Sequence, residues 1–326
     1  MMKLPLRRFL QVTAGLAALA ALFVGLISEL GWSQPTRTIK IVVPFPAGGS
    51  ADILARLLAE QVGRTHPVSL VVENRPGADT IVGTEAAARS APDGSILLIN
   101  ANPFVTNAHL RKPNYDPLTS FEPICHLASS PIVIVVNSTS PYRTFADVLA
   151  AARASPGTLT LASIPTFRIA FEMLKRAAAV DMTFVPYPGN APAVTALLGD
   201  HVTSVLAVYP TVAEQIRANK VRAVVTTSPT RIEALPDLPT VAESGYQGYA
   251  EEAWFGLVAP AKTPRETVTQ ISGWFTAAMA APETKTKLLS QGLYPVGVCG
   301  ADFAAFIRSQ HEAYGQIIRE ANIKAQ

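Results

Sequence analysis

The residues best suited to chemistry stand between Phe45 and Asp52, where an apolar run ends in Phe-Pro-Ala-Gly-Gly-Ser-Ala-Asp. Glycine lets a backbone approach a ligand closely, Ser50 offers a hydroxyl, and the unpaired amides of a helix start attract an anion. The segment therefore predicts an anion cradle; the alternative is a tight strand-to-helix turn capped by Ser50 or Asp52. Because Asp52 would repel a carboxylate, we expect it to organise the loop amides or to meet an amino group.

The same loop lacks the motifs of nucleotide-binding and hydrolytic proteins. No Gly-Lys-Ser/Thr follows, Gly-x-Gly-x-x-Gly is absent, and Ser50 is not in a Gly-x-Ser-x-Gly elbow. His311-Glu312 begins like a zinc-binding helix, but position 315 is Gly and the other histidines stand singly. We expect no cofactor, no metal site and no catalytic residue; a serine hydrolase using Ser50 stays an alternative.

The composition indicates a folded chain of about two domains. It has 326 residues, of which 49% are hydrophobic and 16% charged. The net charge is +3, and three cations and one acid fall within the first 33 residues, so the remainder is almost neutral. With no basic run either, the sequence lacks the electrostatic signature of nucleic-acid binding.

Short runs rich in Val, Ile and Leu alternate with helical stretches. Most runs are continuously apolar, which is typical of parallel strands covered on both faces. They span 39–45, 70–72, 96–99, 132–136, 159–162, 183–185, 202–208, 221–227 and 255–258. Thr144 to Asp147 and Thr263 to Glu266 resemble capping boxes at helix starts, and Asp302 opens a last amphipathic helix. The pattern predicts an α/β fold.

The first 33 residues have the pattern of an export signal. Three cations without an acid precede an apolar stretch from Phe9 to Ile27, and small residues stand at 31 and 33. We predict a cleaved signal peptide over 1–33 and a periplasmic location, by a Sec or a twin-arginine route. An uncleaved anchor is the alternative, although Glu29 ends the apolar run early.

Cys125 and Cys299 are the only cysteines and stand far apart in the chain. An exported protein can form a disulfide, but pairing requires two close α-carbons, which the sequence does not show. Both a disulfide and two buried, unpaired thiols stay open.

Six motifs occur in the order known from one family. They are VPFPAGGSAD (43–52), VENRPGA (72–78), PDG (92–94), VPYPG (185–189), LPDLPTVAE (235–243) and WFGLVAP (254–260). Over residues 35–326 the chain resembles the substrate-binding receptors of the tripartite tricarboxylate transporter family, the Bug receptors. The resemblance implies a two-lobed periplasmic-binding-protein fold (type II-like), each lobe a mainly parallel sheet flanked by helices. It also implies that a small carboxylate is captured in the interlobe cleft and delivered to membrane permease subunits.

The resemblance also implies site residues. The family's first ligand loop matches position by position and assigns ligand contacts to Phe45, Ala47, Gly48, Gly49, Ser50 and Asp52. The second loop is shorter by about three residues and lacks the family's glycines; its candidates are Ser163, Thr166 and Arg168, the last where the family has His. Ala207 stands where the family tends to have Asp. Thr80 is a further candidate, with a plain turn as its alternative.

Arg168 carries the main hypothesis about specificity. A guanidinium can grip a carboxylate through two parallel hydrogen bonds, which would take the place of the amide donors that the shorter second loop does not supply. The alternative is a solvated Arg on a helix face.

The expected organisation has three parts: a signal peptide over 1–33, a first lobe over 34–135 plus 255–326, and a second lobe over 136–254. We expect a monomer that binds a small carboxylate and a permease, and does not bind nucleic acid. The alternative is a protein of the same fold that presents its ligand to a sensor or buffers it without a permease.

Overall fold

The computed structural model describes residues 37–187 and 189–324, and from Thr38 onward the described residues form one compact unit. Strands and helices alternate along it, as predicted. The strands are β1 (Arg37–Val43), β2 (Val68–Asn74), β3 (Ile96–Ala101), β4 (Phe121–Asn137), β5 (Thr160–Ser163), β6 (Thr183–Pro186), β7 (Ser204–Val208), β8 (Val221–Thr226), β9 (Glu252–Pro260) and β10 (Tyr294–Cys299). The helices are α2 (Ser50–Thr65), α3 (Ile81–Ala88), α4 (Pro103–Leu110), α5 (Phe145–Ala154), α6 (Arg168–Ala178), α7 (Asn190–Leu198), α8 (Ala213–Arg217), α9 (Arg265–Ala280), α10 (Pro282–Ser290) and α11 (Ala301–Glu320), with short 3-10 helices at Pro165–Phe167 and Tyr209–Thr211.

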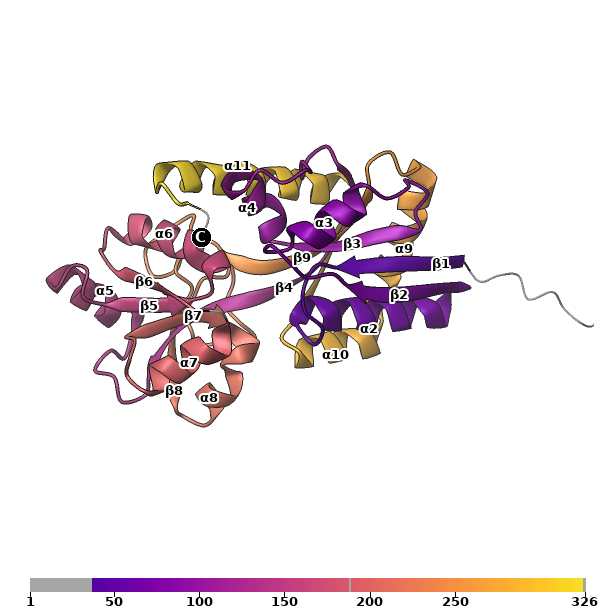
Figure 1. Cartoon of the computed structure of the whole chain (residues 1–326). Coiled ribbons are helices and arrows are strands. Elements are labelled where there is room, and N and C mark those ends of the chain that lie inside the picture. Colours follow the sequence, from indigo (N-terminus) through magenta and orange to yellow (C-terminus); the bar gives the residue numbers. More distant parts are fainter. Residues whose placement is uncertain (1–36, 188, 325–326) are drawn as a thin grey trace, which may run out of the picture. The chain divides into compact units, whose positions relative to one another are not determined.

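The long strand β4 joins two groups of strands (Figure 1). Its first part, to Pro131, pairs with β9 and β10, and its second part, from Ile132, pairs with β7 and β8. The main strand order is β2-β1-β3-β9-β4-β7-β5-β6. The predicted run 132–136 covers only the second part, because Glu122, His126 and two serines interrupt the apolar pattern of the first.

Pairing in the sheet is mixed. The parallel pairs that are described are β1–β3, β5–β6 and β5–β7. By contrast, β4 is antiparallel to each of its partners, and β3 is antiparallel to β9. β8 and β9 each pair with β4 and not with each other in the described sheet, and the segment that connects them contains no helix.

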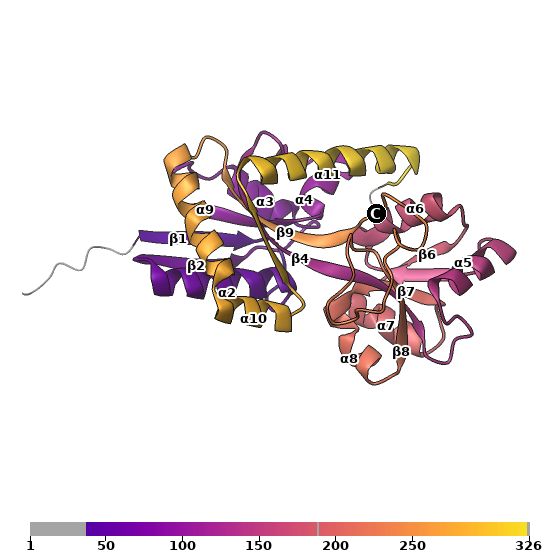
Figure 2. The same cartoon turned by 180° about the vertical axis from the view of Figure 1, so that it is seen from behind.

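Helices cover both faces of the first strand group (Figures 1 and 2). Apolar residues of α2, α9 and α10 pack with β1 on one face, and those of α4 and α11 pack with β3 and β9 on the other. Trp254, the first residue of the WFGLVAP motif, is 1% exposed and belongs to the second of these clusters. In the second strand group, α5 and α6 share one core cluster and α7 another.

One of the two predicted capping boxes, at Thr144 to Asp147, is confirmed at the start of α5. The Asp147 amide donates to Thr144 Oγ1 at 3.2 Å, and the Asp147 carboxylate accepts from the Thr144 amide at 2.9 Å. The prediction at Thr263 is wrong: its hydroxyl donates backwards to the Pro260 carbonyl at 2.7 Å, and Pro264 occupies the cap position. The last helix begins as expected, with Asp302 in its first turn.

The two cysteines form a disulfide, so the alternative of unpaired thiols is wrong. Cys125 and Cys299 face each other across the antiparallel pair of β4 and β10, with α-carbons 3.9 Å apart. The sequence did not reveal this because β10 contains Pro295 and Gly297, residues that argue against a strand.

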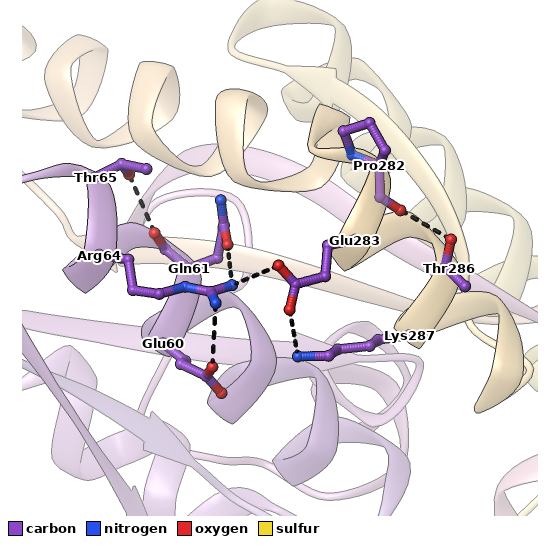
Figure 3. Close-up of polar contacts among 8 residues, drawn as sticks. All are labelled: Glu60, Gln61, Arg64, Thr65, Pro282, Glu283, Thr286 and Lys287. Atoms are coloured by element: carbon purple, nitrogen blue, oxygen red, sulfur yellow. Dashed lines mark hydrogen bonds and ion pairs between the residues drawn. The ribbon is translucent and has the colours of Figure 1, made fainter.

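Exposed charged residues connect α2 to α10 (Figure 3). Arg64 lies between Glu60 of its own helix, at 3.7 Å, and Glu283, at 3.4 Å, and it also donates to Gln61. Glu283 in turn pairs with Lys287 at 2.8 Å. Exposed pairs contribute little each, so the packing of α10 depends mainly on its buried Leu288.

The predicted signal peptide, residues 1–33, lies outside the described residues. Among the residues that are described, none of the helices has the length and apolar character needed to cross a membrane.

Candidate ligand-binding site

The predicted glycine loop connects β1 to α2 on the surface. Ala47, Gly48 and Gly49 are exposed, and α2 begins at Ser50 with Gly49 at its cap position. Gly48 has φ +82°, and a Cβ built on it would meet nothing within 4 Å. The glycine is therefore required by its backbone angle and leaves open space beside the loop.

Asp52 organises this loop, as one of its two predicted roles requires. Its carboxylate accepts the Gly48 amide at 2.9 Å, the Asn74 side-chain amide at 3.0 Å and the Arg56 Nε at 3.0 Å. Burial by itself would raise the pKa of Asp52, but the hydrogen bonds from Arg56, Gly48 and Asn74 together hold the pKa below its ordinary value. The carboxylate is thus ionised and fully engaged, and it fixes where the loop turns.

The other amides at this helix start have no protein acceptor. Among the backbone hydrogen bonds of residues 37–187 and 189–324, none uses the amide of Gly49, Ser50 or Ala51 as donor. No side chain caps the helix either. The turn therefore keeps unpaired donors at a helix N-terminus, and Phe45 lies beside it, half-buried.

The second predicted loop follows β5 and is only partly available. Ser163 is fully buried, and its hydroxyl donates to the Leu206 carbonyl at 2.5 Å. Ala207 is also fully buried, in a core cluster with Val133 and Val205, so its methyl group packs in the interior. Of the second-loop candidates, Thr166 and Arg168 are the ones that reach a cavity.

That cavity has a volume of about 50 Å³. It is lined by Asp79, Thr106, Leu110, Arg111, Pro165, Thr166, Arg168, Ile169, Ile323 and Lys324. Sequence reasoning missed Asp79 and Arg111; the only signal was the position of Asp79 beside the candidate Thr80. The residues of the glycine loop do not line it.

Arg168 opens α6 beside this cavity. Its Nε is buried without a hydrogen-bond partner and lies 3.7 Å from Glu172 Oε1, while the guanidinium lies 6.0 Å from the centre of the Phe184 ring. These are weak contacts for a cation that is one-third exposed. The side chain is neither a fully solvated surface Arg nor a satisfied core Arg.

Thr80 ends a strained turn next to the same cavity. Ala78, Asp79 and Thr80 all have positive φ, of 45°, 52° and 75°, which non-glycine residues adopt at a cost. Asn107 Nδ2 holds the turn by donating to the Asp79 carbonyl at 2.6 Å. Thr80 Oγ1 and Asn107 Oδ1 are buried without partners. Buried polar atoms usually have partners, so these two are notable.

Similar proteins were found by sequence and by structure. Residues 54–323 match the family described as "Tripartite tricarboxylate transporter family receptor". Protein BugT of Bordetella pertussis is 30% identical over 90% of this chain and 91% of its own length. Among solved structures, periplasmic binding protein BugD is 32% identical with a TM-score of 0.75, covering 90% of this chain and all of BugD.

Two further structures were solved with acids bound. R. palustris Rpa4515 with adipate is 29% identical, with a TM-score of 0.77 over 89% of this chain and 99% of that one. MatC from Rhodopseudomonas palustris with bound malate is 26% identical, with a TM-score of 0.73 over 87% of this chain and all of that one. The family consists of periplasmic solute-binding receptors rather than enzymes. With most of its length matched and its fold shared, this chain belongs to the tripartite tricarboxylate transporter receptor family.

Proposed function

We propose that the protein captures a small carboxylate in a cleft between two lobes and delivers it to the permease subunits of a tripartite transporter. The lobes are residues 34–135 plus 255–326 and residues 136–254, and the exported protein acts in the periplasm as a monomer. The observation that carries the proposal is the set of unpaired amides at Gly49, Ser50 and Ala51, held open by Asp52. Such donors at a helix start favour an anion.

Relatives support the class of ligand. Rpa4515 was solved with adipate and MatC with malate, which are both small dicarboxylates. In this chain, Phe45, Ala47, Gly48 and Ser50 would line one side of the ligand. Thr80 of the same lobe, and Thr166 and Arg168 of the other lobe, would complete the site, where three buried polar atoms lack hydrogen-bond partners: Thr80 Oγ1, Asn107 Oδ1 and Arg168 Nε. Ser163 and Ala207 would support the second lobe's part of the site from behind, because both are fully buried.

A thermal-shift panel tests the proposal. The panel contains succinate, malate, adipate, citrate, glutamate and nicotinate, each beside its neutral amide. We expect one class of acid to raise the melting temperature, because a ligand at about 100 times its Kd adds about 2.7 kcal/mol to the free energy of unfolding. Shifts produced by neutral or cationic compounds alone would contradict a carboxylate ligand.

Arg168 is tested with the acid that the panel identifies. Arg168→Ala removes the bidentate grip and is expected to weaken binding about tenfold or more, while Arg168→Lys keeps the charge and recovers only part of the affinity. Arg89→Ala, on the exposed end of α3, is the matched control. If Arg168→Ala binds the acid as tightly as the parent protein does, Arg168 does not contact the carboxylate, which would then be bound elsewhere in the cleft.

A further inference from the structure

A groove with a volume of about 920 Å³ lies beside β8, away from the proposed ligand site. Three segments line it: α5 with the residues before it from Arg143, the end of α8 with β8, and residues 234–246 after β8. None of the residues predicted to bind the carboxylate lines this groove. It is thus a separate feature that the proposed function leaves unexplained.

One side of the groove is an open strand edge. β8 pairs with β4 along one edge, from Val221 to Thr226. On its other edge, the described part of the chain provides a partner only at the very end, where Thr226 forms a bridge to Thr240. The preceding residues Val221–Val224 line the groove instead. An open edge presents amide and carbonyl groups to which an extended chain can add.

Three arginines line the groove, and none of them forms an ion pair with a carboxylate of the described residues at 4 Å or less. Arg222 donates to the carbonyls of Tyr142 at 3.3 Å and Ser138 at 3.1 Å. Arg153 donates to the Ala178 carbonyl and the Tyr246 hydroxyl, both at 3.0 Å.

The third arginine, Arg143, is exposed, and its backbone amide donates to the Asp147 carboxylate at 2.9 Å. This bond, together with the Arg143 charge, lowers the pKa of Asp147, so a carboxylate lies near this arginine without forming an ion pair with it. Within residues 37–187 and 189–324, no ion pair to an acid is found for any of the three. Asp237 is the single acid among the described residues that line the groove, so the lining is cationic.

Apolar side chains lie between these cations. Phe145, Leu149 and Leu238 are buried but reach the groove, and Tyr246 is half-buried beside Arg153. An extended peptide alternates its side chains between two faces, so it could place apolar residues on this floor and acidic residues toward the arginines.

We propose that this groove binds an extended, acidic segment of a partner polypeptide, which adds as a strand to the open edge of β8. The arginines supply charge complementarity, and the edge amides supply hydrogen bonds that do not depend on sequence. The proposal is independent of the carboxylate site.

A polypeptide fits these observations better than a small acid does. The cations come from separate segments: Arg143 precedes α5, Arg153 lies near the end of α5, and Arg222 is on β8, a six-residue strand that spans about 20 Å. A small dicarboxylate could contact only part of such a set. A second copy of this chain is disfavoured because its own β8 edge would bring the same arginines against these.

The test uses an end-capped, fluorescein-labelled peptide of alternating Val and Glu, about seven residues long. We expect binding by fluorescence anisotropy and slower hydrogen exchange at the amides of residues 221–224. Two control peptides are expected to bind about tenfold more weakly or worse. One has Lys in place of Glu and so loses the charge complementarity; the other has alternate N-methylated amides and so loses the backbone hydrogen bonds to β8.

Protein variants complete the test. Arg143→Glu, an exposed change, is expected to weaken the peptide about tenfold, and Arg153→Gln is the second variant, with circular dichroism confirming its fold. Arg217→Glu, on α8 but outside the groove lining, is the control. Two results with these reagents would contradict the proposal: the N-methylated peptide binds as tightly as the parent peptide, or Arg143→Glu and Arg217→Glu change peptide affinity equally. It also fails if glutarate displaces the peptide without slowing hydrogen exchange at residues 221–224. Finally, it fails if sedimentation shows that two copies of the chain associate through the edge of β8.

Discussion

At the scale of single residues, Glu251 is an unusual ionisable group, because its carboxyl is buried. It is 7% exposed, just before β9, and its Oε1 accepts from Tyr314 Oη at 2.5 Å and from Asn102 Nδ2 at 3.2 Å. Burial raises the pKa of Glu251 to about 8, and the charge of the neighbouring Glu252 acts in the same direction. The hydrogen bonds from Tyr314 and Asn102 act in the opposite direction, toward a lower pKa. The carboxyl is therefore protonated at neutral pH and joins α4, β9 and α11 without a counter-ion.

A pH dependence of stability follows from this group. Below about pH 4.5 the carboxyl is protonated in both states; between there and about pH 8 only the unfolded chain ionises. The free energy of unfolding therefore falls as pH rises through this window, by at most about 1.4 kcal/mol per pH unit. Glu251→Gln, which imitates the protonated acid, is expected to flatten that decline.

Urea denaturation of both proteins at about pH 5, 6.5 and 8 measures the effect. The variant should gain stability relative to the parent at the highest pH and not at the lowest. Glu266→Gln, an exposed change on α9, controls for the loss of one ionisable group. Equal slopes for all three proteins would show that Glu251 is already ionised in the folded state.

Two residues show which roles a sequence can indicate. The loop function of Asp52 was predictable because its partner amide, at Gly48, lies four positions away in the same turn. The engagement of Ser163 was not, because its acceptor, Leu206, is 43 positions away on another strand. The hydrogen bond between Glu251 and Tyr314 was not predictable either, because the two residues are far apart in the sequence and meet only once the chain is folded.

At the scale of elements, local signals predict helix starts when the cap is formed by neighbouring side chains. Thr144 and Asp147 satisfy each other's backbone amides at the start of α5. Thr144→Ala removes one of these bonds and is expected to lower the free energy of unfolding by about 1 kcal/mol, while Thr144→Ser retains most of it.

Chemical denaturation measures this change, with Thr195→Ala as the matched control. Thr195 is exposed on α7 and bonds only backwards, to the Ala191 carbonyl at 3.1 Å, so its loss should be near neutral. A cost at Thr195 equal to that at Thr144 would mean that the capping box adds no stability.

Strands were predictable where they are continuously apolar and not where they are broken by polar residues, proline or glycine. The runs at 96–99 and 221–227 correspond to β3 and β8. The first part of β4 and the whole of β10 were not predicted from the sequence, because these strands depend on pairing: β4 pairs with β10 and with β9. Such pairing is non-local, and no window along the chain contains it.

At the scale of the whole molecule, the disulfide between Cys125 and Cys299 closes a long covalent loop, because the two cysteines stand 174 positions apart. The bond ties β10, which precedes the last helix, to the strand that joins both strand groups. A cross-link over so long a loop restricts the unfolded chain strongly, which is the main source of stabilisation in the entropic view. Cys125→Ser/Cys299→Ser is therefore expected to cost about 2 to 5 kcal/mol in the free energy of unfolding.

The control for this prediction is the parent protein itself. Denaturation in dithiothreitol should bring the parent to the stability of the double variant, and dithiothreitol should leave the variant unchanged. Because the cysteines lie outside both the proposed carboxylate site and the β8 groove, ligand affinity at a temperature where each protein is folded should not change. A parent that is equally stable with and without the reductant would show that β10 is held by its strand pairing alone.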